Sequence, residues 1–277
     1  MTIWNAIILG IVQGITEFLP ISSSGHLAIL QNLFGMSTAE NGHLFFDVML
    51  HFGTLISLCT VFWSDITRMI REYGAQRRST KRKKGPQKRY SSVRQLGMIL
   101  IATIPMIIIV PFRHYIERLY YYSAYVGFAL IMTGFALYAA DHLELGNKTH
   151  KDMTIKDALV IGLCQAAAII PGLSRSGLTI AAGFSTGLKK NYAVKFSFLI
   201  SIVAVFGAAV FSLIDAIQAG VLLKYLPAYL IGMAVSAIVG IFAINFVRNM
   251  VNEGKLGSFS YYCWVIGVLT IILTFIF

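Results

Sequence analysis

The chain has 277 residues, of which 57% are apolar or aromatic and only 13% are charged. Soluble domains carry about a quarter of charged residues, so too few charges are present here to cover a water-facing surface of this size. This composition excludes disordered, collagen-like and coiled-coil proteins. We therefore expect an all-α integral membrane protein whose solvent is largely lipid.

The positive charge is concentrated in one segment. The formal net charge of +11 is the difference between 23 basic and 12 acidic residues. Between Ile66 and Gln95 the only acidic residue is Glu72, and the segment carries +10. Its eleven basic residues are Arg68, Arg71, Arg77, Arg78, Lys81, Arg82, Lys83, Lys84, Lys88, Arg89 and Arg94. A basic loop between apolar stretches is a topology signal, so we place residues 66–94 in the cytoplasm and both termini outside, and expect no nucleic acid partner.

Several apolar stretches are long enough to cross a membrane. A helix needs roughly 17 to 25 residues to span a hydrocarbon core of about 30 Å. In chain order, six charge-free runs qualify: Val48–Ser64, Gln95–Phe112, Leu119–Ala140, Phe196–Ile214, Tyr225–Val247 and Leu256–Phe277. Two other apolar regions, 1–36 and 158–188, are interrupted by Pro- and Ser-containing segments and predict helix–break–helix hairpins.

An internal repeat links these two broken regions. Five residues recur exactly 152 positions later, namely Gly10, Gln13, Ser22, Ser24 and Gly25 as Gly162, Gln165, Ser174, Ser176 and Gly177. Each half of the chain, 1–145 and 152–277, then holds one re-entrant hairpin followed by three transmembrane helices. Because an odd number of spans turns the second copy upside down, we predict one membrane domain over residues 1–277 built as an inverted repeat.

The two breaks are the expected binding site. A broken membrane helix leaves backbone groups unpaired, which is tolerated only inside the protein or beside a wet cavity. Ser22–Ser24 and Ser174–Ser176 contain residue types that cap helices, so helices are predicted to begin at Gly25 and Gly177. Two helix N-termini that face each other would form a cradle for an anion.

The few ionisable groups in these regions suggest phosphoryl chemistry. Gln13 and Glu17 are four residues apart and share one helix face, His26 opens the second half-helix, and Arg175 lies in the other break. A guanidinium suits phosphate oxygens, a hydroxyl can attack phosphorus, and a carboxylate can bind a divalent cation or transfer a proton. His51 follows the first hairpin, but the sequence gives it no partner and we assign it no role.

The motifs GIVQGITEFLPISSSGH and PGLSRSG resemble those of the BacA/UppP family of undecaprenyl pyrophosphate phosphatases, and the resemblance covers essentially the whole chain. It implies a multi-pass enzyme of the bacterial plasma membrane, associated with bacitracin resistance. Such an enzyme removes the terminal phosphate of a polyprenyl pyrophosphate lipid. The product is the lipid carrier for peptidoglycan and other cell-wall glycans.

The resemblance also implies roles for individual residues. The expected catalytic residues are Glu17, Ser23, His26 and Arg175, and the expected substrate-binding residues are Gln13, Ser22, Ser24, Ser174 and Ser176. A divalent cation, Mg²⁺ or Ca²⁺, is expected on Glu17. Members of the family also carry Glu at the first motif position, so Gln13 means that this position is not an obligate ionised ligand here. The nucleophile stays open between Ser23 activated by His26, His26 itself and a water.

A transporter or flippase of an anionic lipid or small anion is the alternative function, because secondary transporters also bind substrates at broken helices of inverted repeats. Release of inorganic phosphate from a polyprenyl pyrophosphate by the purified protein distinguishes the two classes. The expected partners are the bilayer and the lipid substrate, with a homodimer as one option for the assembled state.

Overall fold

The computed structural model of the chain describes residues 2–34, 42–82, 91–112, 115–116, 119, 122–144, 146–219 and 225–276. These residues are almost entirely helical, and their only β-type pairing is an isolated bridge between Lys148 and Leu188. The helices are α1 (Ile3–Thr16), α2 (Ser23–Leu33), α3 (Gly42–Val61), α4 (Trp63–Arg82), α5 (Ser91–Ile109), η1 (Val110–Phe112), α7 (Ser123–Asp141), α8 (Ile155–Ala167), α9 (Arg175–Ser185), α10 (Lys190–Ala219), α11 (Leu226–Asn252) and α12 (Ser258–Ile276).

Five of the described helices are long and apolar enough to cross a membrane. They lie in α5 with η1, α7, α10, α11 and α12. A sixth span exists if α3 and α4 are counted together, although the chain bends by 70° at Phe62 between them. The prediction of an all-α protein with several membrane-spanning helices is therefore confirmed.

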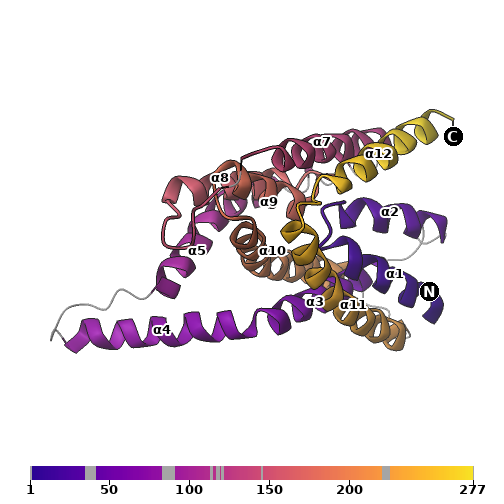
Figure 1. Cartoon of the computed structure of the whole chain (residues 1–277). Coiled ribbons are helices and arrows are strands. Elements are labelled where there is room, and N and C mark those ends of the chain that lie inside the picture. Colours follow the sequence, from indigo (N-terminus) through magenta and orange to yellow (C-terminus); the bar gives the residue numbers. More distant parts are fainter. Residues whose placement is uncertain are drawn as a thin grey trace.

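The prediction that residues 66–94 form a loop is wrong over much of that range. Helix α4 continues to Arg82, α5 begins at Ser91, and residues 83–90 lie outside the described part. Arg, Lys and Gln are good helix formers. The carboxylate of Asp65 in the first turn of α4 also stabilises the helix, because it lies near the positive end of the helix dipole. In Figure 1, α4 extends away from the other helices, and both termini lie at the opposite end of the molecule.

Proline sets the position of both helix breaks. Helix α1 ends at Thr16, four residues before Pro20, and α8 ends at Ala167, four residues before Pro171. A proline has no N–H to donate to the carbonyl four residues earlier, and its ring clashes with that carbonyl, so each helix stops there. Helices α2 and α9 resume at Ser23 and Arg175, two residues earlier than predicted.

Glycines let the hairpin helices approach their neighbours closely. Helix α1 packs against α11, and α8 packs against α5. A Cβ on Gly10 would lie 2.7 Å from the carbonyl oxygen of Gly232, and one on Gly162 would lie 2.4 Å from that of Ala102. The backbones of these helix pairs are therefore in contact, which a residue with a side chain at either position would prevent.

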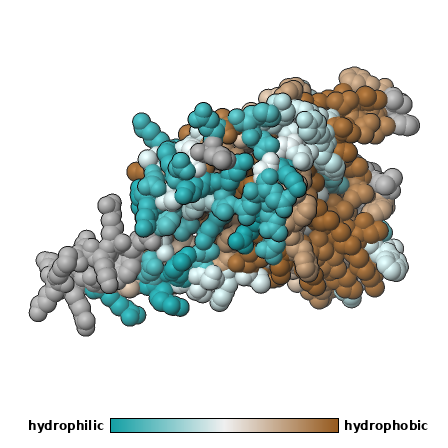
Figure 2. Space-filling view, viewed as in Figure 1, coloured by the Kyte–Doolittle hydropathy of each residue, from teal (hydrophilic) through white to brown (hydrophobic). Residues whose placement is uncertain are grey.

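The surface is divided into hydrophobic and hydrophilic regions. Figure 2 shows hydrophobic residues gathered over the end of the molecule that carries α1 and the end of α12, and hydrophilic residues over the end from which α4 extends. Large apolar side chains such as Trp4, Phe242 and Phe275 are 74%, 70% and 83% exposed. Exposure of so many apolar side chains is expected where the surrounding solvent is lipid.

Candidate active site

Glu17 is the centre of a polar cluster where the two breaks meet. The residue follows α1 directly and is only 6% exposed. Its Oε1 accepts a hydrogen bond from the guanidinium of Arg175, and its Oε2 accepts one from the hydroxyl of Ser23 at 2.8 Å. A buried carboxylate needs such partners, since an unpaired charge away from water is strongly unfavourable.

Ser23 and Arg175 occupy corresponding places in the two hairpins. Ser23 is the first residue of α2, and Arg175 is the first residue of α9, 152 positions later. Both donate to the same carboxylate, one to each oxygen. The structure therefore brings together three of the residues predicted to be catalytic, from breaks that are far apart in the sequence.

Gln13 joins Glu17 to a histidine of α3. Its Nε2 donates to Glu17 Oε2 at 3.1 Å and lies 3.1 Å from His51 Nδ1. The side chain of Gln13 is fully buried, and its Oε1 has no hydrogen-bond partner among the residues that the structure describes. Because an amide nitrogen only donates, His51 Nδ1 is the acceptor of this bond.

His26 makes no hydrogen bond to this cluster among the described residues. Its Nδ1 donates to the carbonyl oxygen of Ser22 at 2.7 Å, which leaves Nε2 as the acceptor of the neutral ring. The hydroxyl of Tyr262 on α12 lies 2.6 Å from this Nε2, and the two rings are stacked with centroids 5.7 Å apart. Among the described residues His26 makes no hydrogen bond to Ser23, so the predicted activation of Ser23 by His26 is not seen in this arrangement.

The turn before α2 has an unusual backbone conformation. Ser22 has a φ of 68°, the only positive φ of a non-glycine residue in the part of the chain that the structure describes. This left-handed conformation disfavours residues with a Cβ and costs of the order of 1 to 3 kcal/mol, so the surrounding contacts must maintain it. Those contacts are the His26 hydrogen bond to the Ser22 carbonyl and the Ser24 hydroxyl, 3.3 Å from that of Ser22.

The serine hydroxyls of the second break form hydrogen bonds with other groups of the protein. The Ser174 hydroxyl caps α9 by accepting from the Gly177 N–H at 3.1 Å, as predicted for a helix cap. The Ser174 N–H donates to Thr133 Oγ1 at 3.1 Å. The Ser176 hydroxyl donates to the carbonyl oxygen of Leu19 at 3.1 Å and so connects the two breaks. Ser174 and Ser176 are 2% and 3% exposed, respectively.

Two residues of this region, His51 and Tyr262, were given no role from the sequence. His51 gave a signal, because it is an ionisable residue inside an apolar stretch, and such residues are usually functional. Tyr262 gave none, since a tyrosine in a membrane helix most often marks the membrane interface.

Comparison with known proteins identifies the family. The family profile described as bacitracin resistance protein BacA matches residues 6–269. The chain belongs to the BacA family. It is 40% identical over 278 residues to an undecaprenyl-diphosphatase of Halothermothrix orenii, with all of both chains covered. It is 41% identical over 274 residues to the undecaprenyl-diphosphatase of Alkaliphilus metalliredigens, covering 98% of each chain, and 39% identical over 284 residues to that of Methanosphaera stadtmanae, covering 99% of each.

Membership of the BacA family confirms the resemblance that the two motifs indicated. The match extends well beyond the motifs, from the first turns of α1 to the middle of α12. The residues of both breaks, and Tyr262 on α12, therefore all lie within the matched region.

Proposed function

We propose that this BacA-family protein hydrolyses undecaprenyl pyrophosphate to undecaprenyl phosphate and inorganic phosphate in the bacterial plasma membrane. The reaction regenerates the lipid carrier for peptidoglycan and other cell-wall glycans. Family membership and the names of the relatives support this activity. The structural observation that carries it is the hydrogen bond between Ser23 and Glu17, next to the cation of Arg175.

In the first step, Ser23 is the nucleophile. Its hydroxyl already donates to Glu17 Oε2, so the carboxylate can take the proton as Ser23 Oγ attacks the terminal phosphorus. A bond forms between Oγ and phosphorus, and the bond from that phosphorus to the bridging oxygen breaks. Undecaprenyl phosphate leaves with the electron pair of that bond.

Arg175 stabilises the charge on the transferred phosphoryl group. Its guanidinium lies on the other oxygen of Glu17 and is 20% exposed, so it can exchange the carboxylate for phosphate oxygens when the lipid binds. Phosphoryl transfer depends largely on positioning and on charge stabilisation of this kind. The isoprenoid tail would lie among the apolar helices.

In the second step, a water hydrolyses the phosphoserine. The water oxygen attacks phosphorus, the bond from phosphorus to Ser23 Oγ breaks, and the proton held by Glu17 returns to Oγ. The water proton goes to the lone pair of His26 Nε2, which becomes available once the hydroxyl of Tyr262 no longer donates to it.

The donors near Glu17 fit a divalent cation only together with the substrate. No group of three or more His, Cys, Asp or Glu side chains within the described residues could hold a metal ion. The Gln13 Oε1 is a buried oxygen to which no described residue donates, next to the carboxylate of Glu17. Mg²⁺ commonly binds one or two carboxylates plus phosphate oxygens, so Glu17 and Gln13 Oε1 would hold it beside a pyrophosphate. The ion would neutralise charge on the phosphate oxygens.

We further propose that the two halves of the chain form the inverted repeat predicted from the sequence, each with a re-entrant hairpin. Three paired features support it. Gly10 and Gly162 meet the backbones of α11 and α5 in the same manner. The hydroxyls of Ser174 and Ser176 lie 3.2 Å apart, close to the 3.3 Å separation of the first serine pair.

The third feature is a reciprocal contact between α7 and α12. A Cβ on Gly127 would lie 2.7 Å from the carbonyl oxygen of Gly267, and a Cβ on Gly267 would lie 2.7 Å from that of Gly127. A contact of this kind, with each residue in the role of the other, is typical of a two-fold relation. With the basic part of α4 in the cytoplasm, both termini would be external.

The proposal is tested with purified protein in detergent and a polyprenyl pyrophosphate. We expect release of inorganic phosphate, a phosphoenzyme that can be trapped by acid and mapped to Ser23, and a loss of turnover of at least about 10³-fold in Ser23→Ala. Ser201→Ala, which removes a hydroxyl on α10 that donates to the Ser197 carbonyl, is the matched control and should retain the phosphoenzyme. Tight binding of the lipid without any phosphate release would instead favour a transporter.

A further inference from the structure

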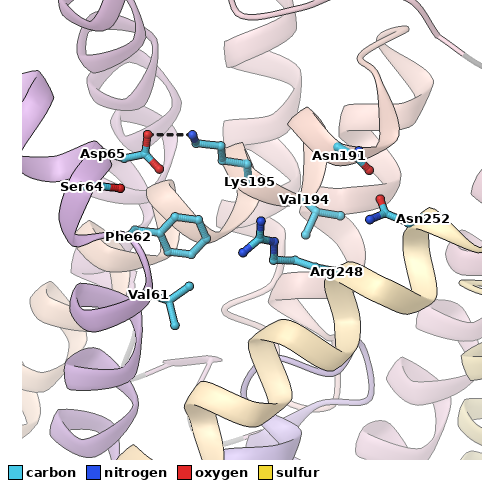
Figure 3. Close-up of a pocket in the computed structure, with 9 residues that line it drawn as sticks. All are labelled: Val61, Phe62, Ser64, Asp65, Asn191, Val194, Lys195, Arg248 and Asn252. Atoms are coloured by element: carbon cyan, nitrogen blue, oxygen red, sulfur yellow. Dashed lines mark hydrogen bonds and ion pairs between the residues drawn. The ribbon is translucent and has the colours of Figure 1, made fainter.

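A polar cavity that shares no residue with the Glu17 site lies at the bend between α3 and α4. It has a volume of about 340 Å³ and is lined by residues of α3, α4, α10 and α11, with Phe62 in its wall. Figure 3 shows the polar side chains that point into it. None of its lining residues belongs to the catalytic or substrate-binding set considered above.

Two cations face this cavity from different helices. Lys195 of α10 forms an ion pair with Asp65 at 2.7 Å. Arg248 of α11 extends toward Lys195 and Phe62 (Figure 3), and it makes no hydrogen bond or ion pair with any described residue. Both side chains line the same cavity, so an anion bound there would be attracted by two cations.

The cavity has an excess of positive charge. Asp65 is its one acidic lining residue, and its carboxylate is shared by Lys195 and by Arg68 one turn further along α4. The region therefore has three cationic side chains, Lys195, Arg68 and Arg248, and one carboxylate. The carboxamides of Asn191 and Asn252 also line the cavity and can donate hydrogen bonds to a bound anion.

The cavity lies at the end of the membrane-spanning segments. Lys195 directly precedes the charge-free run Phe196–Ile214, and Arg248 directly follows the run Tyr225–Val247. Cations at this depth lie at the level of lipid headgroups, where basic pockets between helices bind anionic lipids. Val61, Phe62 and Val194 supply an apolar wall beside the charged groups. The ligand expected from these surroundings has an anionic head and an apolar chain.

We propose that this cavity binds the phosphate group of an anionic membrane lipid, with Arg248 and Lys195 as its cationic donors. The guanidinium of Arg248 can donate two parallel hydrogen bonds to phosphate oxygens. Asp65 competes with the lipid for Lys195 and so limits the affinity. This site does not depend on the proposed hydrolysis, because it involves none of the residues assigned to that reaction.

The test measures lipid binding to the full-length protein in detergent by native mass spectrometry. The probe is phosphatidylglycerol, and diacylglycerol with the same acyl chains is the comparison that lacks a phosphate. We expect Arg248→Ala to weaken phosphatidylglycerol binding by about tenfold or more. Arg78→Ala removes the same charge from an exposed position on α4 and is the matched control, expected to change binding little.

A second variant gives an effect in the opposite direction. Asp65→Asn frees Lys195 and removes the competing carboxylate, so phosphatidylglycerol should bind several-fold more tightly. Unchanged binding in both Arg248→Ala and Asp65→Asn, or equal binding of diacylglycerol, would overturn the proposal. Displacement of the lipid by inorganic phosphate at an equal concentration would overturn the assignment to a lipid, because the apolar wall would then contribute nothing.

Discussion

The break after α1 and the break after α8 share a serine pair at the same spacing but differ in the residues around it. The first break contains Glu17, and the hydroxyl of Ser23 donates a hydrogen bond to its carboxylate. The position that corresponds to Glu17, 152 residues later, is Ile169, and the one that corresponds to His26 is Leu178. The second break thus has the framework of the first without its acid or its imidazole, and it contributes Arg175 instead.

The corresponding glutamines of the two hairpins, Gln13 and Gln165, differ in the same way. Gln13 donates to Glu17 and to His51, whereas neither amide atom of the equally buried Gln165 has a hydrogen-bond partner in the described part of the chain. A buried amide without partners is unfavourable. Both hairpins therefore share the same serine framework. The proposed chemistry needs one acid, one hydroxyl and one cation, and the two hairpins supply these groups together.

The largest expected effect is that of Glu17→Gln, which removes the only acid of the two breaks. The amide cannot accept the Ser23 proton, so turnover should fall by at least about 10²- to 10⁴-fold in a phosphate-release assay. Gln165→Leu, in the corresponding helix of the other hairpin, is the control and should retain the wild-type rate. If Glu17→Gln keeps more than half of the wild-type rate while folded, the first break is not the centre of the chemistry.

Arg175→Ala should have the next largest effect, because it removes the contribution of the second break. We expect kcat to fall by a hundred- to several-thousand-fold, about 3 to 5 kcal/mol, with KM nearly unchanged since the long tail supplies most of the ground-state binding. Arg175→Lys should restore part of the rate, because a point charge cannot form two parallel hydrogen bonds.

Kinetics and thermal unfolding in the same detergent preparation distinguish this role from a structural one. A normal rate per folded molecule, together with a lower unfolding temperature, would mean that Arg175 only anchors the hairpin to Glu17.

Gln13→Glu sharpens the comparison between the two glutamines. A second carboxylate beside Glu17 is repulsive on its own but forms a stronger site for a divalent cation. We therefore expect the variant to be active and to require a lower concentration of Mg²⁺ or Ca²⁺ for half-maximal rate, by about tenfold. A titration of rate against cation concentration measures this. An unchanged half-maximal concentration would place the cation away from Gln13.

Ser176→Ala should have the smallest effect on turnover. Its hydroxyl bonds the Leu19 carbonyl and lies 3.2 Å from that of Ser174, so its removal should lower the free energy of unfolding by about 1 kcal/mol. We expect kcat/KM to change by less than about tenfold. A large rise in KM with unchanged unfolding temperature would instead make Ser176 a substrate-binding residue, as the motif alone suggested.

The sequence predicted those parts of the molecule that depend on local patterns. Charge-free length identified the membrane helices, and Pro20 and Pro171 marked the helix breaks, because a proline acts on the turn just before it. The correspondence of Ser23 with Arg175 was also visible as a repeat.

The rest depends on contacts between distant segments or on competing local preferences. Tyr262 lies next to His26 although 236 residues separate them in the sequence, and no spacing rule reports such a pair. The basic segment was predicted as a loop because its charge was interpreted as solvent exposure. The helix propensity of Arg and Lys is compatible with exposure, and α4 satisfies both.

The close packing of glycines across the two halves has a consequence for how the protein is made. The face of α1 that carries Gly10 is covered by α11, which is synthesised near the end of the chain, and Ser57 of α3 bonds the carbonyl of Ala237 on the same helix at 2.6 Å. During synthesis these early helices enter the bilayer without their final neighbour. We therefore expect the first hairpin to complete its packing late in biogenesis, and a ribosome stalled before Leu226 would leave α1 and α3 without the helix against which they pack.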